Sequence, residues 1–168
     1  MKKNSMINLT KGLLYTILAL FLAGTIINCG GGSTAGPAQV QVPKTLIQDY
    51  ISKHETMVDL SLVDFYAKDE RPKIAAAVNK KIDEMKSAGE LDKLLKATFD
   101  FSNTKISVVG QKEDYINDRP TKLIMVSVSG SYTMQQADSS KTIPADETVV
   151  LEQVNNSWMV TERIHPWS

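Results

Sequence analysis

The chain has 168 residues, with 19 basic and 19 acidic side chains, so its formal net charge is zero. This balance leaves no basic surplus to neutralise phosphates and argues against nucleic-acid binding. The sequence contains one cysteine, which excludes an internal disulfide framework.

Residues 1–28 have the pattern of a secretory signal peptide. Lys2, Lys3 and Lys11 form a positive N-terminal region, and about fifteen mostly apolar residues follow from Leu13 to Ile27. A membrane-spanning helix needs roughly twenty apolar residues, so this run is short for a stable span. We therefore expect residues 1–28 to direct export and then to be removed.

Cys29 directly follows this segment and precedes three glycines. With Ile26 three positions before the cysteine, the arrangement resembles the lipobox of bacterial lipoproteins. That resemblance implies cleavage before Cys29 and acyl chains, such as palmitate, that fix the chain to a membrane of the cell envelope. Burial of such chains contributes roughly 0.8 kcal/mol per methylene. Asn28 stands where the motif usually has Gly or Ala, and the alternative is an uncleaved signal anchor.

Residues 29–42 are rich in glycine and small polar residues, which is typical of a flexible linker. The remaining residues, 43–168, are enough for one domain with one core. Once residues 1–28 are removed, the chain has three more acidic than basic side chains. We therefore expect the lipid, and not the charge of the domain, to hold it at the membrane.

Helices are predicted first in this domain. Apolar residues recur at spacings of three and four from Leu46 to Val58, which predicts a helix over about 44–60. The stretch from Leu60 to Tyr66 either extends this helix or forms a separate turn packed under it.

A second helix is predicted from Arg71, with Pro72 in its first turn, to Gly89, which suits a left-handed end. Its apolar residues fall on one stripe. Leu91 to Leu95 predicts one or two further helical turns.

From about residue 99 the apolar period changes to two, which predicts strands. The predicted strand regions are 99–108, 123–134, 148–154 and 158–164. Two polar segments between them, 110–120 and 135–146, are predicted as loops. Gly130 interrupts the longest strand and indicates a bulge or bend, and Asn155–Asn156 is typical of a tight hairpin turn.

Helices followed by hairpin-linked antiparallel strands predict an α+β fold, with one sheet face covered and the other partly solvated. The helix of Leu46–Val58, the bend at Gly130 and the closing hairpin EQVNNSWMVTERI resemble the nuclear-transport-factor-2-like, or cystatin-like, roll. The chain is similar in particular to small bacterial lipoproteins of unknown function that carry this roll. The resemblance implies N-terminal helices packed on a curved antiparallel sheet of about four strands, with a cone-shaped pocket between them.

His54 is the residue best suited to catalysis, because it lies on the apolar stripe of the first helix and histidine as a residue type suits proton transfer near neutral pH. Enzymes of the roll family often pair such a histidine with an aspartate, and the sequence offers Asp49, Asp59 and Asp64. The simpler interpretation is a half-buried histidine whose nitrogens are satisfied locally. The sequence favours this second interpretation.

Other side chains that could line a pocket are Tyr50, Tyr132 and Trp158, although core packing explains the aromatic residues more simply. The two histidines, His54 and His165, have no metal-ligand spacing, so neither a metal nor a cofactor is predicted.

Fold class alone does not decide function. We expect a non-enzymatic, lipid-anchored protein of the bacterial cell envelope, facing the periplasm or the cell exterior. It would bind a protein partner, which includes a second copy of the chain, or a small apolar ligand. The alternative is a pocket enzyme with His54 as its general base.

Overall fold

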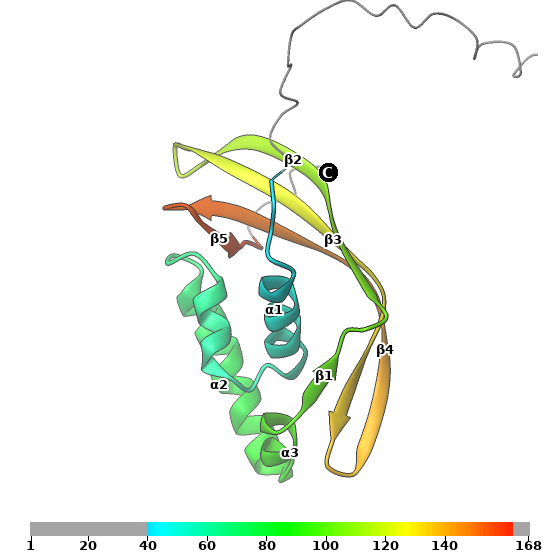
Figure 1. The fold of residues 1–168 in the computed structure, drawn as a ribbon. Helices are drawn as coiled ribbons and strands as arrows, with labels where there is room; N and C mark the ends of the chain where they lie inside the picture. Colours follow the sequence, from blue (N-terminus) through cyan, green and yellow to red (C-terminus); the bar gives the residue numbers. More distant parts are fainter. Residues whose placement is uncertain (1–39, 163–168) are drawn as a thin grey trace, which may run out of the picture. The chain divides into compact units, whose positions relative to one another are not determined.

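The structure, a computed structural model, describes residues 40–162 (Figure 1). The predicted signal peptide, Cys29 and His165 lie outside these residues. The elements are α1 (Lys44–Thr56), η1 (Leu60–Phe65), α2 (Arg71–Ala88), α3 (Leu91–Leu95), β1 (Thr98–Asp100), β2 (Thr104–Ile116), β3 (Arg119–Gln136), β4 (Ser139–Val154) and β5 (Ser157–Val160). None of the helices in residues 40–162 combines the length and apolar character that crossing a bilayer requires.

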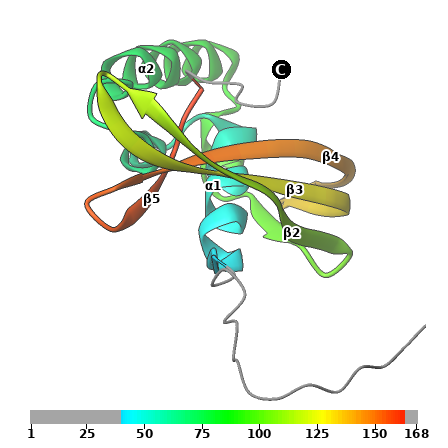
Figure 2. The same ribbon diagram turned by 90° about the horizontal axis from the view of Figure 1, so that it is seen from above.

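The domain is α+β, as predicted: its antiparallel sheet curls around α1 (Figure 1). The view from above shows the strands crossing over α1, with α2 to one side (Figure 2). The sheet follows the order β1-β3-β4-β5, and β2 also pairs with β3. Because β4 occupies one edge of β3, β1 and β2 share the other.

The first helix is shorter than predicted. Its C-terminal end shows whether the stretch from Leu60 to Tyr66 extends this helix or forms a separate turn. Met57 adopts a left-handed conformation with φ of 51° and donates its N–H to the carbonyl of Lys53 at 2.8 Å. The Asp59 side chain then accepts the N–H of Ser61 at 2.9 Å and begins η1. Leu60 to Phe65 is therefore a separate 3₁₀ helix.

The second helix is confirmed. It begins at Arg71 with Pro72 in its first turn, and it ends where Gly89 takes a φ of 73°. Glycine enters this left-handed region without a Cβ penalty, which explains the boundary.

In the described residues the sheet has five strands where about four were predicted. The difference is a turn at Phe101–Asn103 that divides the first predicted strand into β1 and β2. Asp100 starts this turn by accepting the N–H of Ser102 at 2.9 Å, and Thr104 N–H donates to the carbonyl of Phe101 at 3.0 Å.

The prediction of loops at 110–120 and 135–146 is wrong. Both segments are strand arms of hairpins, with turns at Asn117–Asp118 and around residues 137–138. Asn117 and Asp118 have φ of 50° and 61°, which fits a type I′ turn. These arms are mostly exposed on both faces, so they lack the alternation that marks a half-buried strand.

The predicted bend at Gly130 is confirmed. This glycine has a φ of 101°, and a Cβ on it would lie 2.3 Å from the carbonyl oxygen of Asn103. Hydrogen bonds hold the two strands together there: Ser131 N–H donates to Asn103 O at 3.2 Å, and Thr104 Oγ1 donates to Ser131 O at 2.8 Å. Only glycine permits this close backbone approach.

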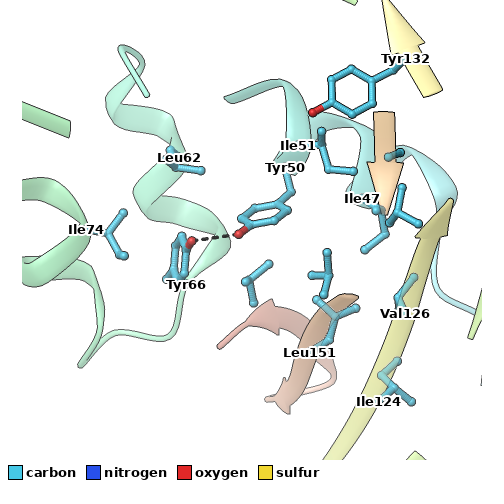
Figure 3. Close-up of a cluster of buried hydrophobic side chains, with 14 of the residues drawn as sticks. Ile47, Tyr50, Ile51, Leu62, Tyr66, Ile74, Ile124, Val126, Tyr132 and Leu151 are labelled. Carbon is cyan, nitrogen blue, oxygen red and sulfur yellow. Dashed lines mark hydrogen bonds between the residues drawn. The ribbon is translucent and has the colours of Figure 1, made fainter. Parts of the chain in front are cut away.

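The core lies between the helices and the curved sheet (Figure 3). Ile124 pairs with Leu151 and Val126 with Val149, so the helix-facing side chains of β3 and β4 lie together. Ile47 of α1 packs against the same cluster, as do η1 and α2 side chains. These contacts fix α1 inside the curve of the sheet.

Candidate functional site

The space between α1 and the sheet contains the side chains that were predicted to line a pocket. Tyr50 projects from α1 and is 7% exposed, and its hydroxyl lies 3.2 Å from that of Tyr66 (Figure 3). Tyr66 donates its own hydrogen to Glu162 Oε1 at 3.1 Å, so Tyr50 must be the donor between the two phenols. This network ties α1 to the segment that follows β5.

The phenols of this interior are strongly desolvated. Burial raises the pKa of Tyr50 to about 12, against a smaller lowering by its hydrogen bond with Tyr66. Burial also raises the pKa of Tyr66, and the hydrogen bond with Tyr50 raises it further. Burial raises the pKa of Tyr132, and the charges of Glu55 and Glu147 add to this. All three are therefore neutral phenols near pH 7, and none supplies a phenolate nucleophile.

Tyr132 and Trp158 complete the predicted set. Tyr132 of β3 is 3% exposed and donates to Glu55 Oε2 at 3.2 Å. Its ring lies 5.3 Å from that of Phe101 and 6.2 Å from that of Phe99, between ring centroids. Trp158 of β5 is half-buried and packs against the core cluster. These aromatic side chains fill space between the helices and the curved sheet.

His54 lies in the same region. It is half-buried, and its ring centroid is 5.3 Å from that of Tyr50. Two of the three aspartates proposed as its partners are engaged elsewhere. Asp59 bonds with Lys53, and Asp64 lies 3.7 Å from Arg71.

Sequence reasoning missed Glu147 of β4, a half-buried carboxyl group whose pKa responds to the charge of His54. Burial raises the pKa of Glu147; the charge of His54 opposes this, and that of Glu55 adds to it. A signal was available: Glu147 alternates with Val149 and Leu151, the core-facing residues of β4. The period of two therefore predicts that it faces the helices.

Residues within 40–162 also line two grooves away from the space between α1 and the sheet. The larger, here called the hairpin groove, has a volume of about 670 Å³ and lies between the chain before α2 and the ends of the β2–β3 and β4–β5 hairpins. It is lined by Ala67, Lys68, Asp69, Ile116, Asn117, Arg119, Pro120, Thr121, Glu152, Gln153, Val154 and Asn155. Asn117 Nδ2 donates to Asp69 Oδ2 at 3.3 Å and joins two of its walls.

The smaller groove, here called the helix groove, has a volume of about 290 Å³ and lies between α1 and α3. It is lined by Asp49, Ser52, Lys53, Thr56, Val58, Asp59, Leu94, Leu95, Ala97 and Phe99. The hydrogen bond from Lys53 lowers the pKa of Asp59 to about 2. Neither groove is lined by Tyr50, His54, Tyr132 or Trp158.

The edge strand β2 carries apolar side chains that are exposed and do not pack in the core. Val108, Val109 and Tyr115 are 40%, 53% and 73% exposed. Within residues 40–162, β2 pairs with β3 alone, so its other edge has no strand partner there. A register shift between Val108 and Gly110 marks a bulge in this strand.

Across residues 40–162, His, Cys, Asp and Glu side chains form no group of three that could hold a metal ion. No family model, curated protein or solved structure matches the chain.

Proposed function

We propose that this chain is a lipid-anchored protein of the bacterial cell envelope, whose domain binds a protein partner along the free edge of β2 and catalyses no reaction. We further propose that the domain is a nuclear-transport-factor-2-like roll. The α1 helix inside the curve of the sheet and the bend at Gly130 support that assignment.

The anchor rests on the sequence. A positive N-terminal region, a short apolar run and Cys29 before three glycines are the features that support export and acylation. Mass spectrometry of the mature protein tests this directly. An N-terminal Cys29 bearing acyl chains is the expected result, and an intact Met1 terminus or an unmodified Cys29 thiol contradicts it. A matched Cys29→Ser variant should move from the membrane fraction to the soluble fraction.

The observation that carries the binding proposal is the exposed apolar edge of β2. An edge strand presents unpaired backbone N–H and C=O groups, and many proteins bury or blunt such an edge. Here Val109 and Tyr115 stand exposed beside it. An extended segment of a partner can add to such an edge through main-chain hydrogen bonds, while apolar side chains give affinity and selectivity.

The bulge limits where a partner strand can pair. Between Val108 and Gly110 the regular ladder of β2 is interrupted, so continuous pairing is available from Gly110 to Ile116. Lys112 and Asp114 form an ion pair at 2.8 Å in this stretch. We expect a partner segment of about six residues, with an apolar side chain against Tyr115.

The roll interior supports a binding role over a catalytic one. Tyr50 and Tyr132 are almost completely buried there, and Phe99 and Phe101 pack against Tyr132. A pocket enzyme with His54 as general base needs space for a substrate beside that histidine. Tyr50, whose ring centroid lies 5.3 Å from that of His54, takes up part of that space, which supports surface recognition over catalysis.

The binding proposal is tested by placing a photo-crosslinking amino acid at Val109 in the full chain, in the cells that make it. The matched control carries the same amino acid at Lys80, an exposed position on α2. An adduct of one defined mass from position 109, and none from position 80, is the expected result. An adduct of twice the chain mass identifies a second copy as the partner. Equal or absent adducts at both positions contradict recognition at β2.

A further inference from the structure

We propose that the hairpin groove binds a small organic anion, whose charged head group is held by Lys68 and Arg119. The ligand class is a carboxylate or a phosphomonoester that carries an apolar body. The proposal depends neither on the lipid anchor nor on recognition at the edge of β2.

The two basic side chains of the groove come from different walls. Lys68 lies in the segment before α2, and Arg119 begins β3. The hydrogen bond from Asn117 Nδ2 to Asp69 Oδ2, at 3.3 Å, joins these two walls. Asp69 directly follows Lys68, and Arg119 comes two positions after Asn117. This bond therefore keeps the two cationic positions close to each other.

The acidic side chains of the groove are already engaged, whereas its basic side chains are not. Asp69 accepts the hydrogen bond from Asn117, and Glu152, which is 2% exposed, also has an interaction partner. Lys68 and Arg119 are exposed, and no acidic side chain within residues 40–162 forms an ion pair with either. The charge that the groove leaves uncompensated is therefore positive, which favours an anionic ligand.

An arginine and a lysine together suit a head group with several anionic oxygens. The planar fork of Arg119 can bond two oxygens of a carboxylate or a phosphate at once, and the ammonium of Lys68 adds a point charge. The neutral amide side chains of Gln153 and Asn155 also line the groove and can donate hydrogen bonds to the same ligand.

The remaining lining and the size of the groove fit the body of a small molecule. Ile116, Pro120 and Val154 supply apolar surface, and the volume of about 670 Å³ lies in the range of small-ligand sites. Asn117 and Asn155 occupy left-handed positions of the two hairpin turns, with φ of 50° and 49°. Because such tight turns fix the hairpin ends, the walls need little rearrangement when a ligand binds.

Fluorine NMR with three probes that share one ring tests the proposal in the full chain. The probes para-fluorophenyl phosphate and para-fluorobenzoate carry the two head groups, and para-fluorobenzamide is the neutral control. We expect saturable line broadening of at least one anion, and binding of the benzamide that is about tenfold weaker or less. The anion that binds more tightly identifies the head group. Equal binding of the benzamide, or no binding by either anion, overturns the proposal.

Single substitutions test whether the anion is bound in the groove. Arg119→Gln and Lys68→Gln should each raise the Kd of the better-bound anion about tenfold, because each removes a charged donor. The matched control, Lys141→Gln, removes the same charge from an exposed position of β4 outside the groove lining and should leave the Kd unchanged. An equal change in the groove and control variants, or no change in either groove variant, overturns the proposal.

Two further measurements separate a loss of binding from a loss of fold. Because Lys68 and Arg119 are exposed, we expect the thermal unfolding midpoints of their variants, without probe, to equal that of the unaltered chain. Arg119→Lys keeps the charge but removes the planar fork, so it should give an intermediate Kd. If Arg119→Gln lowers the midpoint, Arg119→Lys and Lys68→Gln decide the proposal, and an unchanged Kd in both overturns it.

Discussion

Two strands of one hairpin, β3 and β2, use apolar residues in opposite ways. On β3, Ile124, Val126 and Val128 face the helices and have no exposed surface. On β2, Val108 and Val109 are 40% and 53% exposed. Burying a valine or isoleucine side chain fully contributes roughly 1.5–3 kcal/mol, so β3 stabilises the fold while these valines of β2 contribute little. The difference teaches that an apolar pattern can predict a strand without predicting whether its apolar side chains are buried in the core or exposed on the surface.

The comparison is tested most strongly by removing volume from each region. Ile124→Ala, at a site of β3 with no exposed surface, should lower the free energy of unfolding by about 2–5 kcal/mol because it leaves a cavity. The matched control on β2, Val109→Ala, should change it by less than about 0.5 kcal/mol. Urea denaturation measures both. Similar losses in the two variants would contradict the distinction between core and edge.

The bend that lets β3 curve around α1 gives the next largest effect. Gly130→Ala forces an L side chain into a φ of 101° and toward the Asn103 carbonyl, so we expect a loss of about 1–3 kcal/mol. Gly89→Ala is the control: its φ is also positive, but a Cβ there meets nothing within 4 Å. Thermal unfolding should rank Gly130→Ala as the more damaging change. The reverse ranking would show that the close approach at the bend does not constrain the fold.

The elements with strong local signals could be predicted from the sequence. Pro72 and Gly89 mark the ends of α2, the alternation from Ile124 predicts the core face of β3, and Asn155–Asn156 predicts the β4–β5 turn. The bend at Gly130 was also predictable, because glycine inside a strand signals a close approach.

The polar arms of the two long hairpins could not be predicted in this way. Residues 110–116 and 139–146 are largely exposed to solvent. They form strands because their backbones pair with β3, and not because their side chains are buried. The candidate sites depend on the same tertiary information. Asp69 and Asn117 are 48 positions apart and meet only when the β2–β3 hairpin folds back. The possible partners weighed for His54 were aspartates near it in the sequence, yet the carboxyl group whose pKa responds to its charge, Glu147, comes from β4.

Single hydroxyl groups sharpen the contrast between interior and edge. Tyr66→Phe removes the hydrogen bonds that join Tyr50 to Glu162, and it should lower the free energy of unfolding by about 1 kcal/mol. The same substitution at Tyr115, which is 73% exposed on β2, should have no measurable effect. Chemical denaturation of both variants checks this, and equal effects would mean that the Tyr50–Tyr66–Glu162 network contributes nothing specific.

The smallest effect is expected at the rim of the helix groove, where Asp59 is paired with Lys53. The pKa of Asp59 is lowered from 3.8 to about 2, so the native state favours the charged carboxylate. Its contribution to stability is present above about pH 4 and is lost as the pH falls toward 2. Because the Asp59 side chain is 43% exposed, we expect this contribution to be about 0.5 kcal/mol.

Asp59→Asn keeps a side chain that can cap η1 but removes the charge. In this variant, the loss of stability between pH 4 and pH 2 should be smaller than in the unaltered chain. Denaturation curves recorded across this interval measure the difference. Identical pH profiles for the two proteins would show that the Lys53–Asp59 pair does not stabilise the fold.

The central claim is that the apolar edge of β2 serves recognition and not folding. The most direct measurement uses the full chain with a photo-crosslinking amino acid at Tyr115, with and without Val109→Lys, and records both the adduct yield and the free energy of unfolding. We predict that the adduct falls several-fold, while the free energy of unfolding changes by less than about 0.5 kcal/mol. An unchanged adduct, or a domain that no longer folds, would contradict the account.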